Sequence, residues 1–432
     1  MLSYGAMGGG VKVCVIGAGS SYTPELVEGL LLHRDRLSIQ CLALHDIDGE
    51  RLEIIGALTR RILARGQWEG QVIATTSRDE AIDGADFVVV QLRVGGQAAR
   101  YRDETLPLQY GCIGQETAGA GGFAKALRTV PVVLEIAEHV ERRAAKGAWI
   151  VDFTNPVGIV SEALLGHGHR AIGLCNVGIG FQRQFARHFG VEPRRVQLAH
   201  VGLNHLSWER AVLVDGKDRL PELLEGFIEE LSAEVELPAE LIRLGASVPS
   251  YYLRYYYMTR AVLEEQLHAP TRAEHVMDIE RRLFEMYRDP KLDRKPDLLA
   301  QRGGAYYSDA ATELMASLQA DTGDVQVVDV RNDGAIPDLP KEAVVEVSGV
   351  VNSEGAHPLP VEPLPPEMAG LVRQVKSYEM LTVKAAESGS RSTALKALMA
   401  NPLVADFGVA EPMLGELLTA NRSHLPRFFG EV

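Results

Sequence analysis

Short β-rich segments alternate with helical segments through the first half of the chain, and this alternation limits the possible folds more than any other feature. Parallel strands need a long crossover between them, so strands that alternate with helices indicate a parallel sheet covered by helices on both faces. We therefore predict an α/β domain over residues 11–195. The predicted strands are 11–16, 39–44, 71–76, 87–92, 149–153 and 170–174.

The pattern changes after about residue 195. Extended segments at 196–203 and 208–214 flank a Gly-Leu-Asn-His turn that contains Asn204 and His205. The remainder is mostly helical, with two further strands and a proline-rich connector at 357–366. We predict a second, mainly helical α+β domain over residues 196–432.

Charge and composition exclude several classes of partner. The net charge is −14, from 44 Lys and Arg against 58 Asp and Glu, and there is no basic block. This argues against nucleic acid or an anionic membrane as the main partner.

The longest apolar runs, such as Phe87 to Leu92, are far below the ~18 residues of a membrane span. The N-terminal segment has no secretory-signal pattern and there are only four cysteines, so we expect a reducing, cytoplasmic location.

A glycine turn follows the first predicted strand. Gly17 and Gly19 stand between that strand and a helix with Pro24 in its first turn, an arrangement that brings backbone N–H groups to a pyrophosphate. Asp46 ends the second strand, where an acid binds the ribose hydroxyls of NAD. Tyr22 occupies the place of the last glycine in the strict fingerprint. The alternative is a plain glycine turn with an exposed aspartate.

Other polar groups also follow predicted strands, where open α/β sheets bind ligands. Arg93 is suited to a phosphate or carboxylate, and Gln115 lies in a glycine-dense loop of the kind that lets backbone approach a ligand. Cys175 and His205 are far apart in the sequence, so spacing alone leaves packing and a shared metal site both open. The tyrosines at 251–257 form either a packing face or the source of a catalytic base.

Taken together, the segments resemble glycoside hydrolase family 4, the NAD- and manganese-dependent 6-phospho-glycosidases. The similar segments, in order, are GAGSSYTPELVEG, LHDID, QLRVGG, IGQETAGAGGFAKALR, DFTNPVGIVSEAL, GLCNVGIG, GLNHLSW, PSYYLRYYY and RGGAYYS. The CNV string after the sixth strand is similar to 6-phospho-β-glucosidases. The resemblance implies a Rossmann-type domain related to lactate and malate dehydrogenases.

The resemblance also implies a redox route to hydrolysis, an exception to the two-carboxylate scheme. NAD⁺ takes hydride from C3 of the sugar, a base removes the C2 proton, the C1 aglycone is eliminated, water adds, and the hydride returns. Tyr252 is the implied base, with Tyr251 as the fallback. Cys175 and His205 would hold Mn²⁺ or another divalent metal.

Further site residues complete this prediction. For the dinucleotide we expect Gly17, Gly19, Ser20, Ser21, Asp46 and Gln115, and for the phosphorylated sugar Arg93, Asn155, Asn204 and Arg302. The expected substrate is a small 6-phosphorylated β-glucoside such as cellobiose 6-phosphate, and the expected assembly is a homodimer or homotetramer.

Three alternatives remain open. Within the family, the sugar is an α-glucoside, a galactoside or a uronide. Outside it, the chain is a 2-hydroxy-acid dehydrogenase on the same fold, or an NAD-binding sensor without catalytic activity.

Overall fold

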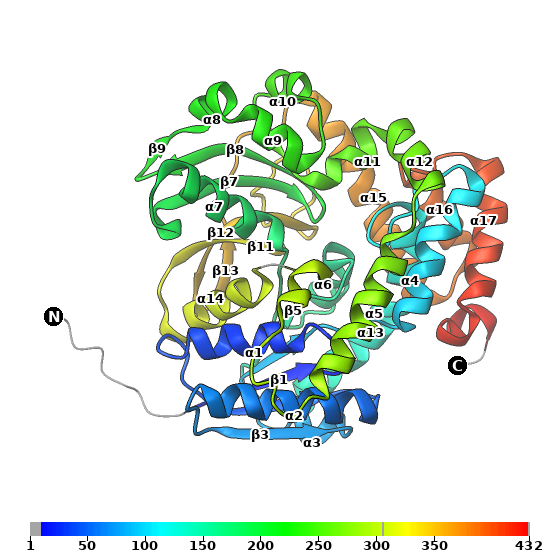
Figure 1. Cartoon of the computed structure of the whole chain (residues 1–432). Coiled ribbons are helices and arrows are strands. Elements are labelled where there is room, and N and C mark those ends of the chain that lie inside the picture. The colour runs from blue at the N-terminus through cyan, green and yellow to red at the C-terminus, as the bar shows by residue number, and fades with distance from the viewer. Residues whose placement is uncertain (1–9, 305, 431–432) are drawn as a thin grey trace.

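Six parallel strands form the first part of the sheet in this computed structural model, which describes residues 10–304 and 306–430 (Figure 1). Their spatial order is β3-β2-β1-β4-β5-β6, so the predicted doubly wound sheet is confirmed. Cys14 of β1 lies opposite Ala43 of β2 and Val88 of β4. The strands are β1 Val11–Ile16, β2 Ile39–His45, β3 Gln71–Thr75, β4 Phe87–Val90, β5 Trp149–Asp152 and β6 Ala171–Gly173.

The same sheet continues through the second half of the chain with antiparallel pairing. Beyond β6 the order is β11, β12, β7, β8 and β10, and β13 and β9 pair at the side with β12 and β8. The residues after 195 therefore extend the first sheet and do not build a separate one. These strands are β7 Val196–Leu203, β8 Leu206–Val214, β9 Lys217–Asp218, β10 Val248–Pro249, β11 Asp324–Arg331, β12 Val344–Asn352 and β13 Gly355–Pro358.

Helices cover the sheet, and α4, α5 and α15–α17 lie together on one side of the molecule (Figure 1). In the first half they are α1 Thr23–Leu32, α2 Gly49–Arg65, α3 Arg78–Ile82, α4 Gly96–Thr105, α5 Gly119–Arg143, α6 Val157–Gly166 and α7 Asn176–Phe189. In the second half they are α8 Leu220–Gly226, α9 Ile228–Val235, α10 Ala239–Gly245, α11 Arg254–Tyr257, α12 Thr259–His268, α13 Arg272–Tyr287, α14 Tyr307–Ala320, α15 Pro366–Ser388, α16 Arg391–Ala400 and α17 Phe407–Ala420. None of the helices in the described ranges is both long and apolar enough to cross a membrane.

Local sequence explains where several helices begin. Asp48 caps α2 by accepting a hydrogen bond from the Arg51 N–H. The long helix α5 begins at Gly119, so the glycine-dense segment forms its first turn. At Gly121 a Cβ would lie 2.3 Å from the Asp103 carbonyl oxygen, so glycine is required by close packing.

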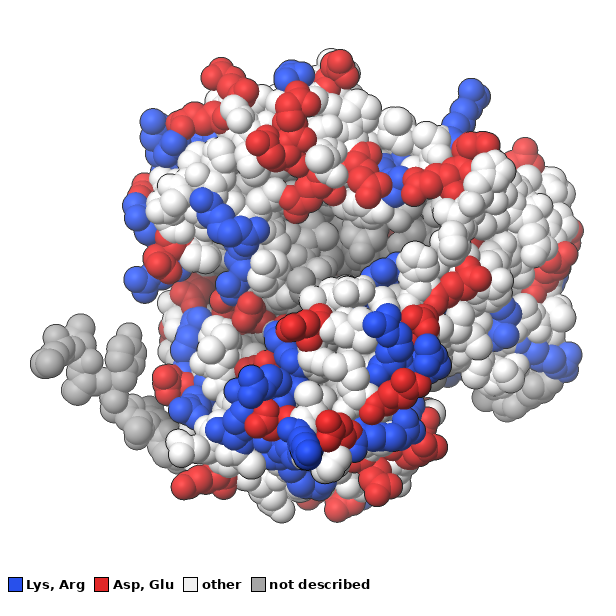
Figure 2. All heavy atoms as spheres, viewed as in Figure 1, with Lys and Arg blue, Asp and Glu red and all other residues white. Residues whose placement is uncertain are grey.

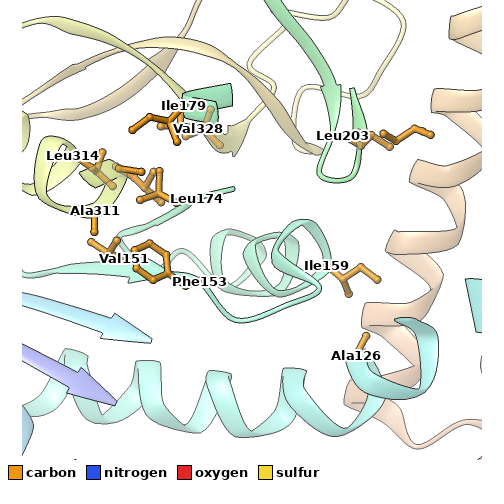
Figure 3. Close-up of a cluster of buried hydrophobic side chains, with 14 of the residues drawn as sticks. Ala126, Val151, Phe153, Ile159, Leu174, Ile179, Leu203, Ala311, Leu314 and Val328 are labelled. Carbon is orange, nitrogen blue, oxygen red and sulfur yellow. The ribbon is translucent and has the colours of Figure 1, made fainter. Parts of the chain in front are cut away.

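The largest buried cluster joins the two halves of the chain. Figure 3 shows Phe153 and Leu174, from the ends of β5 and β6, beside Leu314 of α14 and Val328 of β11. Burial of each such side chain stabilises the fold by about 1.5–3 kcal/mol. Because strands and helices from both halves share this core, the loops at the carboxyl ends of β4–β6 are held against elements of the second half.

Candidate functional site

The glycine turn lies at the carboxyl end of β1, where the strand order turns back between β1 and β4. Gly17 has φ +86°, a conformation that side chains other than glycine rarely adopt. The Gly19 N–H donates to Asp46 Oδ2 at 2.7 Å, so the end of β2 is tied to the turn. A Cβ on Gly19 would meet that same carboxyl group at 2.8 Å. The N–H groups of Gly17 and Ala18 donate to the His45 carbonyl oxygen, so the turn is held by its own hydrogen bonds. A glycine turn without side chains, beside an acid at the end of β2, lets a dinucleotide approach the backbone closely.

The second part of the site is a histidine stacked on a tyrosine. His205 occupies the turn between β7 and β8, and its ring lies on the Tyr252 ring with centroids 3.6 Å apart and planes 13° from parallel. Tyr252 belongs to a short 3₁₀ segment, η3 Tyr251–Leu253, which precedes α11. Two residues that are distant in the sequence are thus brought into direct contact.

The hydrogen bonds around His205 define its tautomer. Thr117 donates its hydroxyl proton to Gln115 Oε1 at 2.8 Å, so it accepts from His205 Nδ1 at 2.9 Å. The lone pair is then on Nε2. Burial lowers the pKa of His205 to about 4, so the ring is neutral near pH 7. A neutral imidazole whose Nδ1 proton is already engaged is the form that binds a metal.

Cys175 lies two residues after β6, at the N-cap position of α7, where its side chain makes no capping hydrogen bond. Burial, and secondarily the Glu346 carboxylate, raise the pKa of its thiol well above the usual value, whereas the Asn204 amide and the backbone at Val177 act in the opposite direction. A bare thiolate is therefore disfavoured at this position, and a bound divalent cation would favour it. Imidazole and thiolate donors fit a divalent transition metal. Over residues 10–304 and 306–430, no set of three or more His, Cys, Asp or Glu side chains is arranged to hold a metal, so a metal held by Cys175 and His205 would need further ligands from substrate or water.

A buried charged network supports the turn that carries His205. Asn204 Nδ2 donates to Glu346 Oε2 at 2.9 Å. The other Glu346 oxygen bonds His200 Nε2 at 2.8 Å, and His200 Nδ1 bonds Glu209 at 2.6 Å. His200, Glu209 and Glu346 are all at most 1% exposed. Sequence reasoning missed all three residues. They belong to three different strands, and the pattern of each strand alone does not show that their polar side chains meet inside the core.

The Tyr252 hydroxyl lies in the same electrostatic environment. Burial, followed by the nearby Cys175, raises the pKa of Tyr252 well above its usual value. A cation beside Cys175 and His205 would lower it again, which is what a tyrosine needs in order to act as a base. Tyr251 instead accepts a hydrogen bond from Arg254 Nη1 at 2.8 Å.

A cluster of cations surrounds Glu116, the residue after Gln115. Arg93 forms a forked ion pair with its carboxylate, Arg100 approaches at 3.2 Å and Lys125 at 2.7 Å. These groups hold the pKa of Glu116 well below its usual range despite burial, and burial with Arg93 lowers the pKa of Lys125 to about 7. Because three basic side chains share one carboxylate, the cluster can bind an additional anion. Sequence reasoning missed Arg100 and Lys125, although a lysine in the otherwise apolar start of α5 was a detectable signal.

Three predicted residues have placements that the sequence did not reveal. Asn155 follows β5, and its Oδ1 is buried without a hydrogen-bond partner among the described residues, as expected of a group that awaits a ligand. Gln115 holds Thr117 and the Ala118 N–H with its Oε1, so it supports His205. Arg302 donates to Ser21 Oγ and Ser20 Oγ of the glycine turn, at 2.7 and 3.4 Å.

Two family models together match most of the chain. Residues 12–191 match "Family 4 glycosyl hydrolase", and residues 200–404 match "Family 4 glycosyl hydrolase C-terminal domain". A Bacillus subtilis protein named probable 6-phospho-beta-glucosidase is 42% identical, with 98% of this chain and 99% of the relative covered. A 6-phospho-alpha-glucosidase of Lacticaseibacillus paracasei is 32% identical, with 96% and 98% covered.

Solved structures agree with these sequence matches. The 6-phospho-beta glucosidase of Thermotoga maritima, solved with manganese, NAD⁺ and glucose-6-phosphate, has a TM-score of 0.91 at 37% identity and covers 96% of this chain and 99% of its own. Malate dehydrogenase of Plasmodium falciparum has a TM-score of 0.55 at 14% identity, which shows the fold alone and confirms the predicted dehydrogenase-like architecture.

Proposed function

This chain belongs to the family 4 glycosyl hydrolases, and we propose that it hydrolyses 6-phospho-β-glucosides with NAD⁺ as a recycled cofactor and a divalent metal such as Mn²⁺. The observation that carries the proposal is the contact between neutral His205 and Tyr252 beside Cys175. It combines a candidate metal ligand and a candidate base, as a redox elimination requires.

NAD⁺ and a divalent metal would supply chemistry that side chains lack: reversible hydride acceptance, which leaves no net redox change, and polarisation of a sugar oxygen. Cys175 and His205 are the residues that would hold the metal. Tyr252 is the proposed acceptor of the proton from C2, and Asn204, fixed by Glu346, is a proposed contact to the sugar.

The cation cluster supports a phosphorylated substrate. Arg93, Arg100 and Lys125 share Glu116, and Arg100 also bonds Glu104 at 2.7 Å, so three cations face two carboxylates. We propose that the sugar 6-phosphate binds Arg93 and accepts a hydrogen bond from Nδ2 of Asn155, whose buried Oδ1 has no partner among the described residues and is available to a sugar hydroxyl. A dianionic phosphate would also favour the charged form of Lys125.

The β anomer follows from the relatives. Identity is 42% to a relative named for 6-phospho-β-glucosides and 32% to one named for 6-phospho-α-glucosides, over nearly equal lengths. The CNV string that contains Cys175 favours the same choice.

A panel of four nitrophenyl glucosides tests this proposal: α and β anomers, each with and without a 6-phosphate. Assays contain NAD⁺, Mn²⁺ and a thiol. We expect turnover of the phosphorylated β compound, at least 100-fold slower turnover of its unphosphorylated form, and no net NADH. Equal rates with and without phosphate would refute the substrate assignment. Stoichiometric NADH accumulation would indicate a dehydrogenase.

We also propose a cytoplasmic location and a homodimer or homotetramer. All four cysteines are free thiols, and Cys175 must stay reduced to bind a metal. Exposed apolar side chains on and near α12 and α13, namely Tyr257, Leu267, Met277 and Met286, support self-association. Light scattering of the purified protein measures the subunit number.

A further inference from the structure

Elements of the second half of the chain converge on the glycine turn. The Tyr287 hydroxyl, at the end of α13, donates to the Ser21 carbonyl oxygen at 2.7 Å. The Tyr22 hydroxyl donates to the Gly304 carbonyl oxygen at 2.6 Å. The turn that we assign to the dinucleotide is therefore not built by the first half alone.

Arg302 is the cation in this group. It ends the 3₁₀ segment η4 Asp297–Arg302, and its Nε donates to Ser21 Oγ at 2.7 Å while Nη2 approaches Ser20 Oγ at 3.4 Å. Ser21 Oγ in turn donates to Glu280 Oε1 at 2.8 Å. The hydroxyl thus accepts from the arginine and donates to the glutamate, so the side chain of Arg302 is fixed on the turn.

Two guanidinium groups lie beside the Glu280 carboxylate at the turn. Glu280 is already paired with Arg51 at 3.2 Å, and Arg51 Nε donates to the Gly19 carbonyl oxygen at 2.9 Å. The Asp46 carboxylate instead accepts a hydrogen bond from the Gly19 N–H. Burial, with contributions from Arg93 and Arg100, lowers the pKa of Arg302 to about 10, so its charge is retained at neutral pH. A bound anion would stabilise this buried charge.

Figure 2 shows the molecule hollowed between the part that carries α7–α10 and the part that carries α1, α2 and α13. Segment η4 precedes α14 in the chain and comes from the second half, whereas Ser20 and Ser21 come from the first. Arg302 of the second half therefore contacts serines of the first half, and a ligand bound by Arg302 at this contact would touch both halves of the chain.

We propose that Arg302 binds the pyrophosphate of the dinucleotide, and not the 6-phosphate of the sugar as we expected from the sequence. This proposal rests on the use of NAD⁺ in the proposed function. Arg302 is already held on the glycine turn by Ser20 and Ser21, so its guanidinium would meet the pyrophosphate without a rearrangement of η4. Arg93 and Asn155 would then hold the sugar phosphate without it.

Calorimetric titrations of the full chain separate the two anions. NAD⁺ and ADP-ribose both carry the pyrophosphate, and glucose 6-phosphate, titrated at saturating NAD⁺, carries only the sugar phosphate. For Arg302→Gln we expect the Kd of NAD⁺ and of ADP-ribose to rise about 10- to 100-fold, and the Kd of glucose 6-phosphate to change less than 2-fold. For Arg93→Gln we expect the reverse.

Arg288→Gln is the matched control, because Arg288 follows α13, is exposed and pairs with Glu50 on the surface. Ser21→Ala is a milder second variant, which removes the hydroxyl that orients the guanidinium and should raise the Kd of NAD⁺ by a few fold. Unchanged Kd values for NAD⁺ in both Arg302→Gln and Ser21→Ala, or a rise confined to glucose 6-phosphate, would overturn the proposal. The test measures binding and not turnover. A wild-type protein that binds NAD⁺ but hydrolyses no glucoside would therefore refute the proposed function, and the role of Arg302 in binding could still be tested.

Discussion

The imidazole of His205 lies flat against the phenol ring of Tyr252, with ring centroids 3.6 Å apart. This contact places the proposed base next to a proposed metal ligand, and Thr117 fixes the ring through Nδ1. The stacking depends on the ring and not on the hydroxyl, so structure and proton transfer can be tested separately.

Tyr252→Phe should keep the stacked pair and remove the base. We expect kcat to fall about 100- to 10,000-fold, the usual range for loss of a general base, with the Mn²⁺ and NAD⁺ affinities nearly unchanged. Steady-state kinetics and metal titration measure both. Tyr251→Phe is the matched control. If it abolished turnover and Tyr252→Phe did not, the base would be Tyr251.

Cys175→Ser should weaken the metal site without affecting the cofactor. A hydroxyl is a far poorer ligand than a thiolate for a divalent transition metal, so the Mn²⁺ concentration for half-maximal activity should rise at least 10-fold. NAD⁺ binding should stay within 2-fold. Cys41→Ser, at a half-buried cysteine of β2, is the control. An unchanged Mn²⁺ dependence would mean that Cys175 serves only packing.

His200 should make stability depend on pH. Burial opposes its charge, but Glu209 and Glu346 raise the pKa of His200 to about 10. The unfolded chain loses this proton near pH ~6.5, so the contribution is fully present below that pH and is lost as the pH rises to about 10. We expect His200→Gln to lower the free energy of unfolding by about 3 kcal/mol at pH 6 and by clearly less at pH 9.5. Denaturant titrations at both pH values measure the difference, and a pH-independent difference would contradict a charged His200.

Gly17→Ala should lower the free energy of unfolding by more than the strain of its backbone conformation alone. Gly17 has φ +86°, and an added Cβ would lie 2.9 Å from the Gln91 carbonyl oxygen. Gly84 has φ +67°, and a Cβ added there would meet nothing within 4 Å, so Gly84→Ala isolates the backbone cost of about 1 kcal/mol. We expect Gly17→Ala to lose at least about 2 kcal/mol and to bind NAD⁺ more weakly. Equal melting temperatures for the two variants would argue against the close approach.

The sequence predicted those parts of the site that depend on local order along the chain. A strand, a glycine turn and a helix at 11–32 are contiguous, and the acid that ends the second strand is brought to the turn by parallel pairing. The family resemblance named Cys175, His205 and Tyr252, but only the fold shows that His205 and Tyr252 touch. Long-range pairing cannot be predicted from periodicity, because a strand pattern is compatible with many neighbours.

The sequence alone determined the doubly wound architecture, since hydrophobic periodicity and helix-start signals act over a few residues. Tertiary structure decided which polar and charged groups surround each carboxylate: Arg93, Arg100 and Lys125 on Glu116, His200 and Asn204 on Glu346, and Arg51 with Arg302 around Glu280. It also brought Arg302, which we expected at the sugar, against Ser21 of the glycine turn, and this contact is the basis of our proposal that it binds the pyrophosphate. The physical reason is that burial makes each charge depend on its partners, and partners from different elements meet only when the sheet and its helices are packed.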